Sequence, residues 1–446
     1  ENSSEEQYLL SIIKHNLKLA WLLPITRHEK PQVVDEAKHS FSIILRPDIF
    51  DTLIRVNRDM GQVRIRTWVG GDKDGHPGVN EKVMLQCLQC SREYFIDIFH
   101  RMSENLAKDI NYLNNDELKL MLKDFFKCLD DIKKIKKNDS KRVQNLKSNI
   151  QKMDVLYHQV VGARAPRLKK LKSIIELFSG LVIPIELRED SEIIAAALLS
   201  DKKFPIENML STLKEICGNG SLSCYAQGMI ISMCESFSDV TNAMKLFKKN
   251  VGTLSIPIIP LFETADALKN SSKIVKKILD HKEYHRQIKT KWNNHLEIML
   301  GYSDSSKGMG VLASRLGIAR TMRALDVLIT SDGIIPVFFH GSGGSVDRGG
   351  GSVKEQTSWW PKSALHLYKA TIQGEMVERN FSSPEVTIAG VNNVLKNLDK
   401  VKSRKGEIKL NKEMQNFSNI VESLYVKKIN DPDFFNMVEL ATPYSY

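Results

Sequence analysis

The chain has few cysteines for its 446 residues and no long apolar run. Its six cysteines lack the paired spacing of a disulfide framework, so we expect reduced thiols and a cytoplasmic location. No stretch is apolar over the length that spans a bilayer, and we therefore expect no membrane anchor. The opening ENSSEEQ has neither the basic start nor the apolar stretch of a signal peptide. Because the chain opens on Glu1 rather than Met, we expect it to be an excerpt of a longer product.

The formal net charge of +11 permits binding to nucleic acid, so the positions of the lysines matter. They concentrate in residues 130–152 and 396–414. Both stretches lack interleaved aromatic residues and any known nucleic-acid fold signature, which favours solvated helix faces or loops. We expect no nucleic-acid partner. The competing hypothesis, a basic barrel that binds nucleic acid, requires an affinity that falls steeply with salt.

Helical periodicity dominates the chain, and short apolar runs separate the helical stretches. The periodicity predicts helices in residues 8–20, 80–129 and 142–178. The apolar runs are continuous rather than alternating, which is typical of strands buried on both faces. They lie at 63–69, 181–187, 255–262, 295–302 and 334–340. Strands separated by long helical stretches predict a parallel sheet, and we expect a predominantly helical α/β fold with a (β/α)8 barrel in a single domain, residues 1–446.

Two acidic residues follow neighbouring strands of the predicted sheet. Glu263 lies in PLFETAD and Asp304 in GYSDSSKG, each directly after an apolar run. The carboxyl ends of parallel strands meet at one face of a barrel, so the two carboxylates could come together there. Oxygen ligands of this kind suit Mg²⁺ or Mn²⁺. Taken alone, each acid could equally be a helix N-cap or a surface charge.

A glycine-rich segment, FHGSGGSVDRGGG at 339–351, follows the last predicted strand. Its glycines let backbone N–H groups approach an anion, and Arg348 adds a guanidinium that can bind phosphate or carboxylate. The alternative is a flexible surface loop. Arg188 and Lys307 supply two further cations at strand ends, although acidic neighbours could neutralise Arg188 locally. His340 could shuttle protons, bind phosphate or be a structural imidazole, and the sequence leaves this open.

Several of these segments resemble the motifs of phosphoenolpyruvate carboxylases. RTWVGGDKDGHPGV resembles the family's W-M-G-G-D-R-D-G-N-P, and PIELREDS resembles L-D-I-R-Q-E-S. ISMCESFSDV is similar to a family stretch with S-M and S-D-V at the same spacing. IPLFETADAL, MLGYSDSSKGMG and FHGSGGSVDRGGG resemble L-F-E-T, G-Y-S-D-S-x-K-D-x-G and F-H-G-R-G-G-S-x-G-R-G-G. The six motifs occur in the family's order, and WLLPITRHEKPQVVDEAKHSF and NDPDFFNMVELATP extend the resemblance toward both ends.

The resemblance implies a role for each matching residue. Glu263 and Asp304 match metal-ligand acids. Arg188 and Arg348 match arginines that hold substrate, while Lys307 and His340 match other active-site positions. The remaining matches bind substrate: Trp68, Leu261 and Met299 form a pocket for the methylene of phosphoenolpyruvate, and Gly343 and Gly344 belong to the glycine-rich loop.

The resemblance also implies a reaction and an assembly. In the family reaction bicarbonate attacks the phosphoryl group of phosphoenolpyruvate, which gives carboxyphosphate and the enolate of pyruvate. Mg²⁺ or Mn²⁺ and the arginines stabilise the developing charge, and carboxylation then yields oxaloacetate and phosphate. The expected partners are phosphoenolpyruvate and bicarbonate, and the expected oligomer is a homotetramer.

The chain departs from the family pattern at several points. It contains neither the upstream A-H-P-T-E motif nor the downstream G-S-R-P motif. Ser342 stands where the family has Arg, Asp347 and His76 replace Gly and Asn, and Gly308 replaces the Asp after the motif lysine. A serine cannot supply a guanidinium charge, and Asp347 adds a negative charge beside an anion site. These departures favour a second hypothesis, a non-catalytic relative that serves as a binding or interaction protein.

Overall fold

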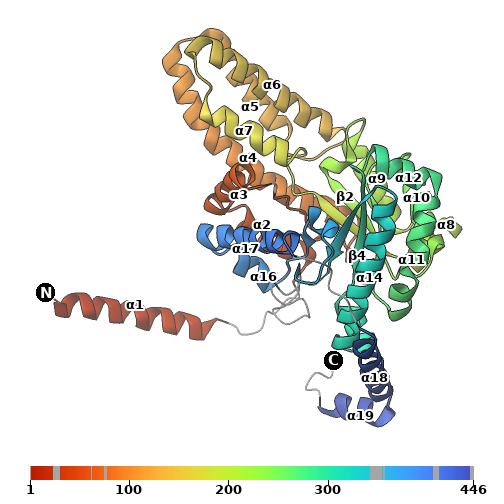
Figure 1. The fold of residues 1–446 in the computed structure, drawn as a ribbon. Coiled ribbons are helices and arrows are strands. Elements are labelled where there is room, and N and C mark those ends of the chain that lie inside the picture. The colour runs from red at the N-terminus through yellow and green to blue at the C-terminus, as the bar shows by residue number, and fades with distance from the viewer. Residues whose placement is uncertain are drawn as a thin grey trace.

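The computed structural model describes residues 2–23, 31–61, 63–74, 78–341, 354, 357–404 and 411–441. Helices predominate in this part of the chain and cover a parallel sheet (Figure 1). The first helices are α1 (Asn2–Leu22), α2 (Val33–Ile44), α3 (Pro47–Asp59), α4 (Glu81–Leu113), α5 (Asp116–Asp131), α6 (Asp139–Val161), α7 (Pro166–Leu177), α8 (Ser191–Leu199) and α9 (Pro205–Cys217). They are followed by α10 (Phe237–Val251), α11 (Ala265–Asp280), α12 (Lys282–Thr290), α13 (Ser303–Met309), α14 (Val311–Ser331), α16 (Glu375–Asn380), α17 (Pro384–Lys402), α18 (Lys412–Ile429) and α19 (Pro432–Ala441).

The helical stretches predicted from periodicity are present but interrupted by turns. The predicted 80–129 helix is α4 and α5, because Asn114 adopts a left-handed conformation (φ 48°) that ends α4. Asn115 then caps α5 by accepting a hydrogen bond from the N–H of Leu118. In the same way Gly162, with φ 77°, ends α6 before α7. Asparagine and glycine are the residues that tolerate this backbone region, so both breaks follow from the sequence.

Six strands form the described sheet, all parallel and in the order β1-β2-β3-β4-β5-β6. The strands are β1 (Ile185–Asp190), β2 (Ala226–Ser232), β3 (Ile258–Phe262), β4 (His295–Leu300), β5 (Ile335–His340) and β6 (Lys369–Ala370). The prediction of a parallel α/β sheet is therefore confirmed. Two strands, β2 and β6, were not predicted as strands.

The strand predicted at 63–69 is wrong in its extent. This segment meets β1 only at two isolated bridges, Thr67 with Ile185 and Asp72 with Arg188. The N–H groups of Gly71 and Asp72 both donate to the carbonyl of Trp68, which turns the chain directly after Trp68. The turn prevents a continuous ladder, so the segment lies beside β1 without forming a regular strand.

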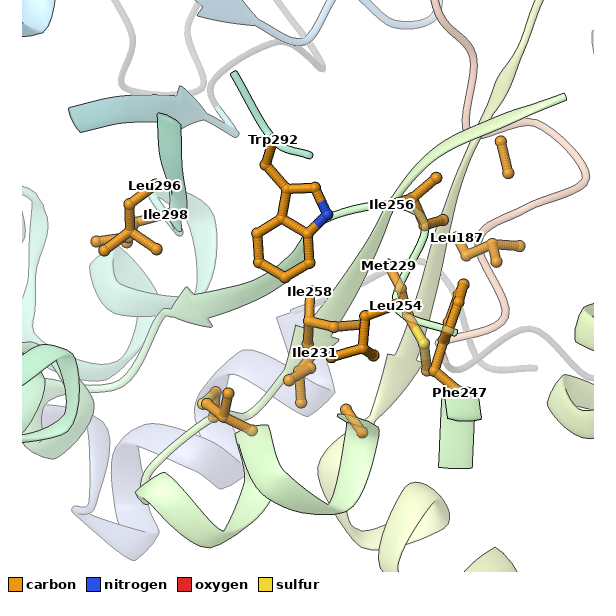
Figure 2. Close-up of a cluster of buried hydrophobic side chains, with 14 of the residues drawn as sticks. Leu187, Met229, Ile231, Phe247, Leu254, Ile256, Ile258, Trp292, Leu296 and Ile298 are labelled. Carbon is orange, nitrogen blue, oxygen red and sulfur yellow. The ribbon is translucent and has the colours of Figure 1, made fainter. Parts of the chain in front are cut away.

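Side chains alternate between the two faces of the sheet. On β2, Met229 and Ile231 belong to a large buried cluster between the sheet and its helices, whereas Ile230 belongs to a separate small cluster on the other face. Figure 2 shows part of the large cluster, where Phe247 of α10 packs beside side chains of β1, β2 and β3. Because both faces bury apolar side chains, β3 and β5 are almost wholly apolar, whereas β1 and β4 also carry charged residues.

A second large cluster joins helices α2 to α7, and it surrounds a buried arginine. Arg92 of α4 has no exposed surface and binds Asp139 at the start of α6, with 2.6 Å between Nη2 and Oδ2. Its remaining hydrogen bonds go to the carbonyl oxygens of Ile132, Gly180 and Leu181. The arginine thus ties the helices to the segment that leads into β1 and fixes where the sheet begins.

Candidate functional site

The two acids predicted as metal ligands follow neighbouring strands. Glu263 comes directly after β3, and Asp304 lies in the first turn of α13, after β4. In the register of β3 and β4, Leu261 pairs with Met299, which sets Glu263 opposite Gly301. A Cβ at Gly301 would lie 2.4 Å from the Cβ of Glu263, so glycine is needed for this close approach.

Several charged side chains act on the carboxyl group of Glu263. The carboxyl group is buried, and its Oε1 accepts a hydrogen bond of 2.8 Å from the N–H of Met233. The pKa of Glu263 is raised to about 7, mainly by burial and also by the negative charge of Asp304, while the hydrogen bond from Met233 and the charge of Arg188 act to lower it. The structure therefore gathers Glu263, Asp304 and Arg188 at the carboxyl ends of the strands.

Arg188 of β1 is paired with acids that sequence reasoning did not assign to the site. Its Nε and Nη2 atoms bind the two carboxylate oxygens of Asp72 at 2.7 and 2.8 Å, and Nη2 lies 3.7 Å from Asp74. The sequence predicts that acidic neighbours in the chain neutralise Arg188, whereas in the structure Asp72 and Asp74 are its acidic partners. These bonds use one edge of the guanidinium, and Nη1 makes no hydrogen bond with a described residue. Within the described part of the chain, that second edge has no hydrogen-bond partner.

Three residues predicted to contact the substrate methylene meet on the inner face of the sheet. Leu261 and Met299 are buried, and Trp68 packs against them. We call this group the inner apolar cluster; its members are Trp68, Ile230, Ile259, Leu261, Met299 and Phe339. Its members Leu261 and Met299 lie two residues before Glu263 and Gly301. An apolar surface beside carboxylates and an arginine suits a ligand that has one apolar and one anionic part.

His340 is the last residue of β5 and is completely buried. Its ring stacks on Trp360 with 4.0 Å between centroids, and Nδ1 lies 2.6 Å from the hydroxyl of Tyr302. Burial lowers the pKa of His340 to about 3, so the imidazole is neutral at physiological pH. Nε2 is buried and has no hydrogen-bond partner among the described residues. This geometry favours the structural alternative over a cation that binds phosphate.

Lys307 lies on α13 one turn after Asp304, and the two side chains form an ion pair of 3.0 Å. The lysine is 77% exposed, so its ammonium group reaches solvent while neutralising part of the charge of Asp304. Arg348, Gly343 and Gly344 lie outside the described residues, as do Ser342, Asp347 and His76. Their predicted roles remain predictions.

A charge network that joins β1, β4 and β6 was not predicted. Lys369 of β6 binds Glu186 of β1 at 2.9 Å and Glu297 of β4 at 2.7 Å, and Arg66 binds Glu186 at 2.7 Å. We call these four residues the basal charge network. Burial alone would raise the pKa of Glu186, but Lys369 and Arg66 lower it. The Lys369 ammonium group also lies 4.2 Å from the centre of the Phe339 ring, so the network contacts the inner apolar cluster through a cation–π interaction.

The strand ends hold another acid that sequence reasoning missed. Glu189 is the fifth residue of β1 and is only 2% exposed. Burial raises its pKa to about 7, although the N–H of Asp190 donates to its Oε1 and the charge of Lys73 lowers the pKa. Its Oε2 has no partner among the described residues. The sequence could have indicated this acid, because Glu189 comes directly after Arg188 near the end of a strand.

Two features are absent from the described part of the chain. No group of three or more His, Cys, Asp or Glu side chains in this part of the chain is arranged to hold a metal ion. No described helix is long and apolar enough to cross a membrane.

Comparison with known proteins gives a consistent result over the whole chain. The family model for phosphoenolpyruvate carboxylase matches residues 1–176 and 183–446. The phosphoenolpyruvate carboxylase of Psychromonas ingrahamii is 25% identical over 474 residues, which cover 88% of this chain and 53% of the relative. That of Chromohalobacter salexigens is 24% identical over 508 residues, which cover 96% of this chain and 57% of the relative. The enzyme of Hahella chejuensis is 26% identical over 463 residues, which cover 86% and 52% respectively.

The chain thus spans about half the length of the curated relatives it matches. Because the family model covers nearly every residue, the chain belongs to the phosphoenolpyruvate carboxylase family.

Proposed function

We propose that this chain forms a large part of the catalytic region of a magnesium-dependent phosphoenolpyruvate carboxylase. The enzyme would convert phosphoenolpyruvate and bicarbonate to oxaloacetate and phosphate, in the cytoplasm and as a homotetramer. We also propose that residues 1–446 form one domain in which the six-stranded sheet is part of a (β/α)8 barrel. The observation that carries the proposal is the meeting of Glu263, Asp304 and Arg188 beside the inner apolar cluster.

The donor set at the strand ends fits a divalent ion. Glu263 and Asp304 offer only oxygen, the ligand type that Mg²⁺ and Mn²⁺ prefer. Burial and the charge of Asp304 raise the pKa of Glu263, and a cation between the two carboxylates would relieve both effects. A bound Mg²⁺ would supply positive charge to the phosphate and enolate oxygens of the substrate.

The remaining residues have roles that follow from their chemistry. The free edge of Arg188 would hold the phosphate or carboxylate of phosphoenolpyruvate, while Asp72 fixes the orientation of the guanidinium. The substrate methylene would lie against Trp68, Leu261 and Met299. Bicarbonate oxygen would attack phosphorus and displace the enolate oxygen with its electron pair, which gives carboxyphosphate and the enolate of pyruvate. The bond between the carbon and the phosphate oxygen of carboxyphosphate would then break, which releases carbon dioxide and phosphate. The apolar surface would then exclude water, so that the enolate carbon attacks carbon dioxide before a proton reaches it.

The metal site can be tested with this chain alone. We expect Glu263→Gln and Asp304→Asn each to weaken Mn²⁺ binding at least about tenfold, measured by the electron paramagnetic resonance of free Mn²⁺. Asp116→Asn is the matched control, because the side chain of Asp116 is 99% exposed at the start of α5. Unchanged Mn²⁺ affinity in both site variants would refute the assignment.

A non-catalytic relative remains the second candidate. It is favoured by the pairing of Arg188 with Asp72 and by Ser342, which stands where the family has Arg. An assay of oxaloacetate formation from phosphoenolpyruvate and bicarbonate, on the full-length gene product beside this chain, separates the two. Activity that depends on both substrates and is lost in Asp304→Asn supports the carboxylase. Mn²⁺ binding without turnover in the full-length product supports the binding protein.

A further inference from the structure

A helix from the carboxyl-terminal part of the chain contacts the segment that carries Asp304. Helix α18 packs against α13 and α14, and its Tyr425 donates a hydrogen bond of 3.0 Å to the carbonyl oxygen of Lys307. Glu422 on the same helix acts on Arg320 of α14, where its charge opposes the lowering of the arginine pKa by burial. Helix α18 is therefore fixed to both helices that meet after β4.

The ring of Tyr425 covers the junction between these two helices. Gly310 ends α13 and precedes α14, and its φ of 82° and ψ of 153° are open to glycine but strained for other residues. A Cβ at Gly310 would lie 3.2 Å from Cγ of Tyr425, so the ring rests directly on the backbone there. The tyrosine thus touches α13 at two points, the carbonyl of residue 307 and the junction at residue 310.

The opposite side of α13 is already fixed inside the protein. Ser305 is buried, and its hydroxyl lies 2.5 Å from the carbonyl oxygen of Gly301 and 2.6 Å from the hydroxyl of Ser314. These bonds anchor the first turn of α13, and the buried side chain of Met309 packs at its last residue. Asp304 is the residue before Ser305, so its direction depends on how the whole of this short helix is held.

We propose that Tyr425 is a positioning residue that holds α13 so that the Asp304 carboxylate faces Glu263. The proposal rests on the metal site proposed above. The tyrosine touches neither carboxylate; it acts through the Lys307 carbonyl and the Gly310 junction. The segment GYSDSSKGMG is thus held in part by Tyr425, which lies on a helix more than 100 residues later in the chain.

The test removes the hydroxyl and keeps the ring. Tyr425→Phe loses the hydrogen bond to Lys307 but still covers Gly310, so we expect an unchanged midpoint of thermal unfolding. We expect its dissociation constant for Mn²⁺ to rise about threefold to tenfold, the change that one hydrogen bond can carry. Tyr112→Phe is the matched control, because Tyr112 is 90% exposed at the end of α4.

A double-mutant cycle shows whether the effect passes through Asp304. In the Asp304→Asn background, Tyr425→Phe should leave the remaining Mn²⁺ affinity unchanged. An unchanged affinity of Tyr425→Phe in the otherwise native chain would overturn the proposal, and so would an equal loss with and without Asp304. If Asp304→Asn and Glu263→Gln themselves bind Mn²⁺ normally, the metal site is refuted first, whatever the tyrosine variant does.

Discussion

Glu189 offers a quantitative test of how burial acts on the acids at the strand ends. Its carboxyl is 2% exposed, one of its oxygens has no partner among the described residues, and burial raises its pKa from 4.5 to about 7. The corresponding position of the family motif L-D-I-R-Q-E-S is glutamine. We therefore consider Glu189→Gln, which keeps the shape of the side chain and removes its ionisation.

The raised pKa fixes the direction of the effect. Between pH 4.5 and 7 the folded state keeps a proton on Glu189 that the unfolded state releases, so the free energy of unfolding falls as pH rises through this window. The difference between the two pKa values corresponds to at most about 3 kcal/mol. Water at the open ends of the strands reduces this, and we expect Glu189→Gln to gain about 2 kcal/mol more at pH 8 than at pH 5.

Urea unfolding at pH 5 and pH 8 measures this difference directly. Glu192→Gln is the control, since Glu192 is exposed in the first turn of α8 and its substitution should give nearly the same change at both pH values. If Glu189→Gln shifts stability equally at the two pH values, the carboxyl is not held protonated by burial, and the explanation given for its pKa is wrong.

Two further substitutions test how the sheet is held and how closely its strand ends approach. Arg92→Met should destabilise the chain by about 3 kcal/mol in urea unfolding, because the buried Asp139 loses its shortest ion pair and keeps only Arg142 and the hydroxyl of Tyr225. Arg101→Met, on the exposed side of the same helix, should change stability little. Gly301→Ala should cost about 1–3 kcal/mol and weaken Mn²⁺ binding, because the new Cβ collides with Glu263, whereas Gly308→Ala enters open space and should do neither.

The sequence predicted the sheet better than its boundaries. Continuous apolar runs identified four of the strands, since strands buried on both faces need no alternation. It failed at 63–69, where hydrogen bonds to the Trp68 carbonyl turn the chain, because local composition does not report such a turn. It also failed at β6, whose two residues carry no periodicity that could be read.

The site was predictable where its residues lie next to strands in the sequence. Glu263 follows β3 directly and Asp304 lies in the first turn of the helix after β4, and these are neighbouring parallel strands. Asp72 and Tyr425 could not be found in this way, because their partners are distant in the chain and no local pattern links them. The state of His340 was also beyond the sequence, since its neutrality depends on burial beneath Trp360.

The basal charge network shares no residue with the proposed metal and substrate site. Its two cations and two anions balance, and its ion pairs join β1, β4 and β6 through Glu186, Glu297 and Lys369. A related protein could therefore change or lose the reaction at the site while it keeps the ion pairs that join the strands.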